Sequence, residues 1–230
     1  MNFLKVSCFV IVFAFASCNP LNIKNEQGFS DVLSIVVNKD GVKYIKNSYS
    51  TFTAQALDTI PEESCGVASY IVDYENQPAN TPPYEANLIS WKKLGSPFKY
   101  ISGSIHDSYN DTVLSISSVL NLEHFMFLYV DQKVPEDYVY GYELLCCKDS
   151  VENERMVMYL KTKLYSEGID SISRNRSSII AFDILPFLED QIKQGNDSLI
   201  QFNLKYSYKT DLIGNLIYSA YKSNPIKINP

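Results

Sequence analysis

The chain has 230 residues, of which 46% are hydrophobic and 20% are charged, and its formal net charge is −6. These fractions are close to those of globular proteins, which excludes a disordered or collagen-like chain. The acidic balance, with no cluster of lysines or arginines, argues against nucleic acid as a partner.

Residues 1–17 predict an export signal. Lys5 supplies the only positive charge, and the apolar run after it is too short to span a bilayer comfortably. Two small residues precede Cys18, as in a bacterial lipobox, although Phe15 stands where that motif usually carries an aliphatic residue. We expect Cys18 to be acylated and residues 18–28 to form a polar tether. The alternative is an ordinary cleaved signal followed by an incidental cysteine.

Five short strands are predicted after the tether, and residues 38–41 carry the hairpin-turn signal Asn-Lys-Asp-Gly between the first two. The strands are 32–37, 42–45, 51–57, 66–74 and 84–91. Gly and Pro at residues 93–97 mark a domain boundary, so residues 29–95 are predicted to form a small barrel.

Residues 96–230 are predicted to form an antiparallel β-sandwich with one short helix. Hydrophobic residues alternate with polar ones along most of its strands, which is the pattern of half-buried strands. The clearest strands are 122–130, 138–147, 156–164 and 200–208. The helix is predicted at 186–193, with Asp183 as its cap, Pro186 in its first turn and Gly195 at its end. The predicted fold class is therefore all-β.

The cysteines leave two interpretations open. Three cysteines remain after the signal and the lipidated residue are set aside, so at least one thiol is expected to stay free. They are Cys65, Cys146 and Cys147. They are interpreted either as small buried hydrophobes or as a disulfide from Cys65 to one of the adjacent pair. No Cys-x-x-Cys pair occurs, so no zinc site is predicted.

Catalytic patterns are weak in this sequence. Cys65 and His106 could pair as nucleophile and base, but nothing in the sequence brings them together. His124 alternates with apolar residues and is interpreted as a packed strand histidine. The acidic pairs are interpreted as solvated charges; they are Glu62–Glu63 and Asp73/Glu75. We expect no catalysis, no metal and no cofactor.

The triplet Asp-(Ser/Thr)-aliphatic occurs more often than this composition predicts by chance, and it resembles a bacterial O-glycosylation signal. The candidate acceptors are Thr59, Thr112, Ser150, Ser171 and Ser198. Thr112, Ser150 and Ser171 are favoured because they are expected to lie in loops. An equally good interpretation is that Asp-Ser/Thr opens turns before strands resume.

Several residues carry a resemblance to a known family. They are the lipobox at Cys18, residues 58–62 leading into 66–74, the strand at 84–91, and residues 181–185 before the helix, followed by the strand at 200–208. This arrangement resembles the NigD-like lipoproteins of anaerobic Gram-negative bacteria. The resemblance implies an N-terminal OB-type barrel, a C-terminal β-sandwich and a cell-envelope location. It implies no enzymatic activity, because none is established for the family, whose name comes from a bacteriocin gene cluster.

The functional expectation is a non-enzymatic lipoprotein, anchored through its lipid in the outer membrane, that binds a protein or a glycan. The predicted ligand face is the aromatic surface of the barrel, with Tyr70, Tyr84 and Trp91 as its main candidates and Tyr44 and Tyr49 beside them. Two alternatives remain: an accessory lipoprotein for bacteriocin immunity or secretion, and a hydrolase that uses Cys65 and His106.

Overall fold

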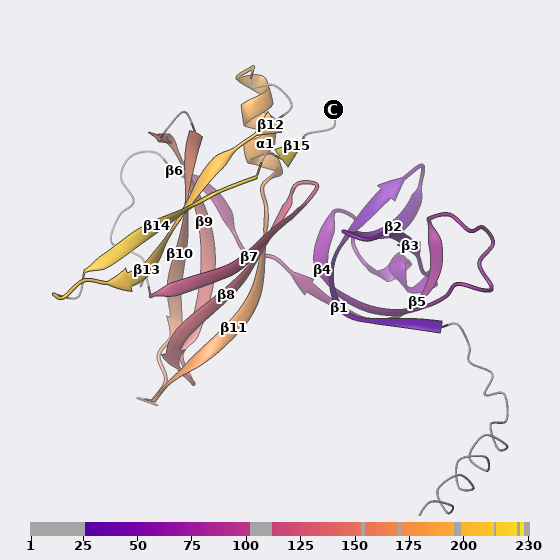
Figure 1. The fold of residues 1–230 in the computed structure, drawn as a ribbon, viewed down its shortest axis with the longest axis horizontal. Coiled ribbons are helices and arrows are strands. Elements are labelled where there is room, and N and C mark those ends of the chain that lie inside the picture. Colours follow the sequence, from indigo (N-terminus) through magenta and orange to yellow (C-terminus); the bar gives the residue numbers. More distant parts are fainter. Residues whose placement is uncertain are drawn as a thin grey trace, which may run out of the picture.

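The computed structural model describes residues 26–101, 112–152, 155–169, 172–195, 199–213, 215–224 and 226–227. Within these residues the protein is all-β with one short α-helix, which confirms the predicted fold class. A barrel and a sandwich lie next to each other along the long axis of the molecule (Figure 1). The predictions on residues 1–25, His106, Ser171 and Ser198 lie outside the described residues.

The N-terminal part is a closed barrel with strand order β1-β2-β3-β5-β4. Its strands are β1 (Glu26–Lys39), β2 (Val42–Asn47), β3 (Thr51–Thr53), β4 (Ser64–Asp73) and β5 (Tyr84–Leu94), and the 3-10 helix η1 (Gln55–Thr59) connects β3 to β4. β1 begins at Glu26, so residues 26–28 belong to the barrel and not to the predicted tether. Asp40 and Gly41 adopt positive φ in the turn between β1 and β2, which is typical of a tight hairpin.

β1 closes the barrel because it bends. It pairs with β2 through its C-terminal half and with β4 along nearly its whole length. The register with β4 shifts between Phe29 and Val32, and Asp31 lies there with φ of 54°. A bulge of this kind bends the strand and increases its twist.

The barrel core is an apolar and aromatic cluster. Its buried members are Val36, Ile45, Phe52, Leu57, Ile60, Ala68, Tyr70 and Val72. Ala68, Tyr70 and Val72 are alternate positions of β4, and β1, β2 and β3 each contribute one residue, as expected when one face of each strand points into a closed barrel. Leu57, the single buried side chain of η1, belongs to this cluster.

The C-terminal part is a sandwich whose strands and helix are β6 (Phe98–Ile101), β7 (Leu114–Leu122), β8 (Phe125–Pro135), β9 (Val139–Glu152), β10 (Arg155–Ser166), β11 (Ser173–Asp183), α1 (Leu185–Lys193), β12 (Leu199–Ile200), β13 (Phe202–Thr210), β14 (Leu216–Lys222) and β15 (Ile226–Lys227). A five-stranded sheet of order β14-β13-β10-β9-β6 packs against a three-stranded sheet of order β11-β8-β7. β12 and β15 form a separate pair.

The sandwich is not fully antiparallel, which corrects the prediction. β6 runs parallel to β9, and β13 runs parallel to β10. Parallel neighbours need long connections, and both strands enter this sheet after the chain has left another part of the fold. The alternation of apolar and polar residues along a strand predicts which of its faces is buried. It does not predict whether the neighbouring strand runs parallel or antiparallel.

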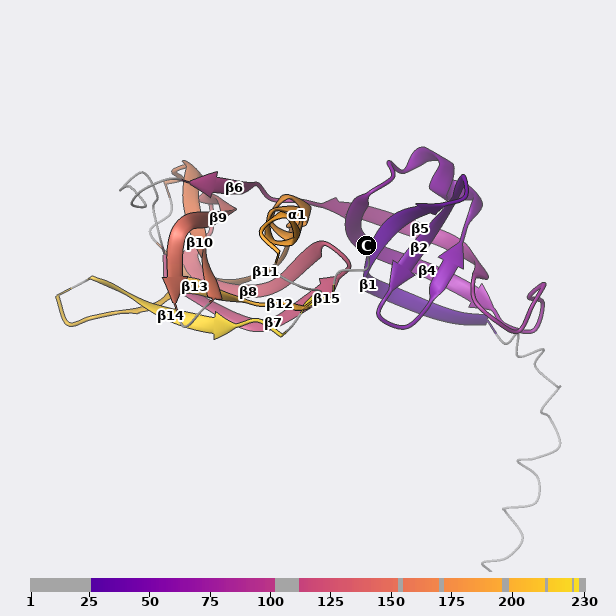
Figure 2. The ribbon, with the colours of Figure 1, turned by 90° about the horizontal axis from the view of Figure 1, so that it is seen from above.

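Helix α1 packs into the sandwich core. Phe187 and Leu188 are buried in the same cluster as residues from both sheets, and Figure 2 shows the helix between the layers. The backbone N–H of Leu185 donates to Asp183 Oδ1 at 2.9 Å, and Gly195 has φ of 80° after the last turn. The N-cap position is held by Ile184, which corrects the predicted cap: Asp183 binds the first turn from one residue before it. Gly195 ends the helix as predicted.

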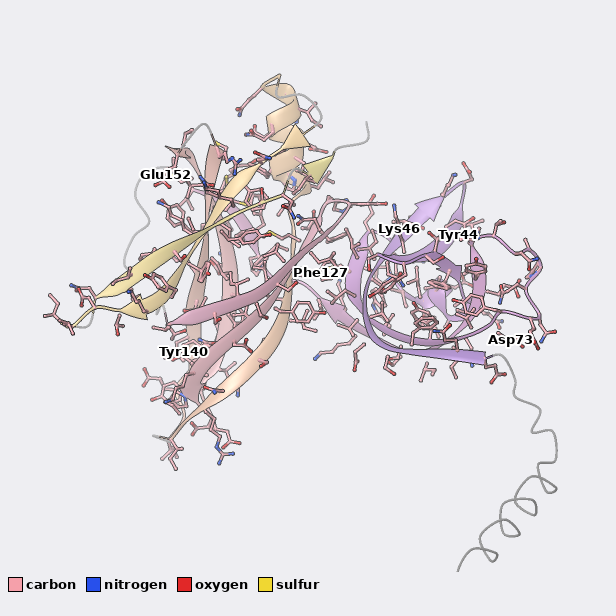
Figure 3. All side chains as sticks on the ribbon, viewed as in Figure 1. Tyr44, Lys46, Asp73, Phe127, Tyr140 and Glu152 are labelled. Atoms are coloured by element: carbon pink, nitrogen blue, oxygen red, sulfur yellow. The ribbon has the colours of Figure 1, made fainter. Side chains whose placement is uncertain are left out.

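A second apolar cluster joins the barrel to the sandwich. The barrel contributes Leu33, Ile35, Cys65 and Val67, and the sandwich contributes Leu122, Phe125, Phe127 and Ala181. Figure 3 labels Phe127 at this junction. Because these side chains are buried against each other, the two parts share a core.

Candidate functional site

A groove of about 520 Å³ lies on the outer face of the barrel, where it approaches the sandwich. Its lining residues are Val37, Asn38, Lys39, Tyr44, Lys46, Thr51, Pro82, Pro83 and Glu123. They come from β1, β2, β3, the β4–β5 connection and the turn between β7 and β8. The groove is therefore built by residues that are far apart in the sequence.

Strand alternation places the side chains of β2. Ile45 is fully buried in the barrel core, so its neighbours Tyr44 and Lys46 point to the outer face (Figure 3). Thr51 extends this face onto β3, and the cis-linked Pro82 and Pro83 add lining from the β4–β5 connection.

Asn38 holds the end of the β1–β2 hairpin in place. Its Oδ1 accepts from the backbone N–H of Gly41 at 3.0 Å, and its Nδ2 donates to Glu62 Oε1 at 2.7 Å. The side chain therefore links the hairpin turn to the segment before β4 and fixes the rim of the groove.

Glu123 brings the sandwich into the groove. It lies in the turn between β7 and β8 with φ of 52°, and its carboxylate accepts from Lys46 Nζ at 2.7 Å. The two side chains are 43% and 39% exposed. An exposed ion pair of this kind contributes at most about 1 kcal/mol of stability, so its main effect is to position both groups at the groove.

The groove has the chemistry of a site for a hydroxyl-rich ligand. Tyr44 and the two prolines offer apolar surface, and Asn38, Thr51, Lys39, Lys46 and Glu123 offer hydrogen-bond donors and acceptors. Apolar surface with a few convergent polar groups is typical of a ligand-binding cleft.

The predicted ligand face of Tyr70, Tyr84 and Trp91 is corrected by the structure. Tyr70 is fully buried, and its ring packs 4.8 Å from the ring of Phe52. Tyr84 and Trp91 are half-buried and pack against the same core. These side chains are on the inner side of the barrel wall because the strands close around them.

Of the two secondary aromatic candidates, Tyr44 lines the groove and Tyr49 does not. Tyr49 is 81% exposed in the connection between β2 and β3. Sequence reasoning missed Lys46, Glu123 and the two prolines. The alternation of β2 could have placed Lys46 beside Tyr44, but no local signal connects β2 with a turn in the other half of the chain.

The cysteines are buried and form no disulfide with one another. Cys65 lies in β4 in the shared cluster, and Cys146 belongs to the sandwich core. Burial, followed by the charge of Asp183, raises the pKa of Cys65 to about 12. Cys65 is therefore a protonated thiol near neutral pH and a weak nucleophile.

The other titratable candidates make contacts that stabilise turns and packing. His124 lies in the β7–β8 turn and not in a strand, with its ring 4.2 Å from that of Phe125. Asp73 accepts from the backbone N–H of Glu75 at 3.1 Å and from Asn76 Nδ2 at 2.6 Å, so it fixes the start of the β4–β5 connection. In the described part of the chain, no group of three His, Cys, Asp or Glu side chains could hold a metal ion.

The candidate glycan acceptors differ in accessibility. Thr59 is exposed at the end of η1, and its hydroxyl donates to the Ala56 carbonyl at 2.9 Å. Thr112 is half-buried, and its hydroxyl accepts from Gln132 Nε2. Ser150 lies within β9 and not in a loop, because the strand continues to Glu152.

None of the helices among the described residues has the length and apolar character needed to cross a membrane. No protein-family model matches the sequence, and no curated protein matches it.

Solved structures share the fold. An uncharacterized protein from Parabacteroides merdae aligns with a TM-score of 0.60 and 16% identity, over 86% of this chain and 97% of that one. A "putative lipoprotein" from Bacteroides fragilis aligns at 0.59 and 14% identity, over 88% and 99%. A NigD-like immunity protein from Bacteroides caccae aligns at 0.53 and 13% identity, over 86% and 97%. The expected resemblance to NigD-like proteins is confirmed at the level of the fold.

Proposed function

From a fold shared with a NigD-like protein, we propose that this chain is a non-enzymatic, lipid-anchored protein of the cell envelope that binds a glycan through the groove beside Tyr44. The observation that carries this proposal is the groove itself. It combines an outward aromatic ring, two prolines and a paired Lys46 and Glu123 at one place.

The strand order supports an OB-type barrel. A closed five-stranded barrel in which β3 neighbours β5 and β4 neighbours β1 has the arrangement expected of that fold. OB-folds bind oligonucleotides and oligosaccharides on the face of their second and third strands, between the β1–β2 and β4–β5 loops. The groove lies on this face, and the acidic net charge disfavours a nucleic acid.

The anchor is supported by the lipobox at Cys18 and by the lipoprotein name of one structural neighbour. Two or three acyl chains on Cys18 would hold the protein stably at the outer membrane. The test is fractionation of cells that express the protein with its own signal. The wild type should follow the membrane and the Cys18→Ser variant should be soluble; a membrane-bound Cys18→Ser variant contradicts the anchor.

A non-enzymatic role is supported by the surroundings of Cys65. A catalytic cysteine needs a thiolate near neutral pH, whereas burial keeps Cys65 protonated. The alternative hydrolase would need a different nucleophile or a base close to this thiol.

Binding can be tested with two probes, maltoheptaose as a neutral chain and a galacturonate heptamer as an acidic one. We expect at least one to bind in isothermal titration calorimetry, and Tyr44→Ala to weaken it roughly tenfold, about 1.4 kcal/mol. Tyr49→Ala is the matched control, because Tyr49 is more exposed but lies outside the groove. Equal losses in both variants, or no binding of either probe, would contradict the proposal.

A second candidate is bacteriocin immunity, which is favoured by the name of the neighbour from Bacteroides caccae. Deletion of the gene should then sensitise the producing strain to its own bacteriocin, and the intact gene should restore resistance. A deletion strain with unchanged sensitivity removes this candidate.

A further inference from the structure

Strand β5 is paired very unequally on its two sides. Toward β4 it is paired from Ala86 to Leu94. Toward β3 it pairs only at Tyr84 and Glu85, because β3 ends at Thr53 and the chain turns into η1. In the described part of the chain, the β5 edge beyond Glu85 has no strand beside it.

A groove follows this open edge. It consists of two adjoining hollows of about 580 and 430 Å³, which share Ala54, Gln55 and Ala86 as lining residues. The smaller hollow lies between the start of η1 and the first residues of the open edge, and Asn87 and Leu88 complete its lining. The edge is therefore accessible and has a wall opposite it.

The backbone of the edge determines the kind of ligand. Every second residue of a strand directs its N–H and C=O groups away from its paired neighbour, so an open edge repeats donors and acceptors at a period of two residues. Only another extended polypeptide matches this repeat. The small side chains of Ala54, Ala56 and Ala86 leave room for a second backbone.

The side chains of the groove favour a basic partner. Asp58 and Glu85 line the larger hollow, and both are exposed. Lys43 lies in the same hollow, but its Nζ donates to the backbone carbonyls of Ile60 at 2.8 Å and Asp58 at 3.3 Å. The carboxylates therefore face solvent, while the ammonium is directed to the backbone.

Exposed apolar side chains complete the surface. Val42 lines the larger hollow and is 46% exposed, and Ile89 follows Leu88 on the edge and is 61% exposed. A strand laid beside β5 would place alternate side chains next to Ile89 on the outer face.

We propose that the β5 edge at residues 86–90 binds an extended, basic segment of a partner protein by strand addition. This site is distinct from the groove beside Tyr44, because the two share no lining residue. The protein then has two partner surfaces on one barrel, one for a glycan and one for a polypeptide.

The test uses two blocked, fluorescent octapeptides, alternating Lys-Val and alternating Glu-Val. We expect the Lys-Val peptide to bind the wild type in fluorescence anisotropy at least tenfold more tightly than the Glu-Val peptide. The backbone amides in residues 86–90 that point away from β4 should exchange at least tenfold more slowly when the peptide is bound. Absence of binding, or protection elsewhere in the chain, would overturn the proposal.

Two variants localise the binding. Ala56→Trp fills the smaller hollow and should abolish binding, and Glu85→Lys should reverse the preference between the two peptides. Ala79→Trp is the matched control, because Ala79 is exposed in the β4–β5 connection and lines neither hollow. Tyr44→Ala should bind the peptide like the wild type. Equal peptide binding by Ala56→Trp and Ala79→Trp would contradict this assignment. It would also be contradicted if the wild type self-associated and only Ala56→Trp abolished that self-association, because the edge would then bind a second copy of the chain.

Discussion

At the scale of single residues, Cys65 shows how the fold sets the chemistry of a side chain. The thiol is 3% exposed, and its Sγ donates to the carbonyl of Leu94 at 3.6 Å. Burial is the largest cause of its raised pKa, and the negative charge of Asp183 adds to it. The same surroundings that make Cys65 a weak nucleophile also make the stability of the folded protein depend on alkaline pH.

This predicts a pH dependence of stability. The unfolded thiol has a pKa of 9.0 and the folded thiol one of about 12, so between these values only the unfolded state has lost the proton. Cys65 therefore reduces the free energy of unfolding by up to about 1.4 kcal/mol per pH unit as pH rises above 9. Urea unfolding of the wild type and Cys65→Ala at pH 8, 9.5 and 10.5 should show a shallower alkaline loss in the variant. Parallel curves for the two proteins would contradict this.

A second prediction concerns the glycan acceptors. Thr59 is exposed, whereas the Thr112 hydroxyl is half-buried and already accepts a hydrogen bond from Gln132. We expect mass spectrometry of the protein from its native host to find a glycan on Thr59 and none on Thr112. An unmodified Thr59 would support the turn interpretation of these triplets.

At the scale of elements, the pairing of β4 with β5 depends on Gly66. A Cβ at this position would lie 2.5 Å from the carbonyl oxygen of Lys92 and 2.8 Å from the ring of Trp91. The backbone oxygen cannot move away without disturbing the ladder.

Gly66→Ala should therefore lower the free energy of unfolding by about 1–3 kcal/mol, as overpacking does in other cores. Gly28→Ala in β1 is the control, because no atom lies within 4 Å of its added Cβ. Thermal unfolding measures both changes. Equal melting temperatures of the two variants would contradict this prediction, because β4 and β5 would then accommodate the added Cβ without loss of stability.

The sequence predicted elements better than it predicted their surroundings. Alternation located β2, β4 and β13, and the cap and stop residues located α1, because these signals are local. Tyr44 and Tyr70 both occupy alternating strand positions, yet one lines a groove and the other is core. Barrel closure decides which face is inside, and it depends on pairings between distant residues. The position of His124 in a turn was missed for a different, local reason: its apolar neighbours have the pattern of a continuous strand.

At the scale of the whole molecule, a shared cluster and an ion pair join the two parts, and a hydrogen bond fixes the connection between them. The shared cluster contains four buried residues from each part. Lys46 of the barrel pairs with Glu123 of the sandwich. In the connection between β5 and β6, the Ser96 N–H donates to the Ala181 carbonyl at 2.8 Å. The sequence indicated a boundary near residues 93–97 but not this shared core, because Leu33, Val67 and Phe127 meet only after both parts have folded. The same contacts place Glu123 at the groove of the barrel.

Phe127 is the central test of this coupling. It is fully buried on β8, between Leu120 on β7 and Ala181 on β11, and its ring belongs to the shared cluster. Truncation to alanine should lower the free energy of unfolding by about 3–5 kcal/mol. The lost packing lies at the contact between the two parts. We expect the wild type to unfold in one calorimetric transition and Phe127→Ala in two.

Phe187→Ala is the matched control for Phe127→Ala. Phe187 is equally buried, but it lies in the sandwich core away from the barrel. Its truncation should lower the melting temperature while the transition stays single, because the shared cluster is intact. Two transitions in the wild type would mean that the parts fold independently, and Glu123 would then not be held at the groove by a common core. One transition in Phe127→Ala would mean that the parts stay coupled without this side chain.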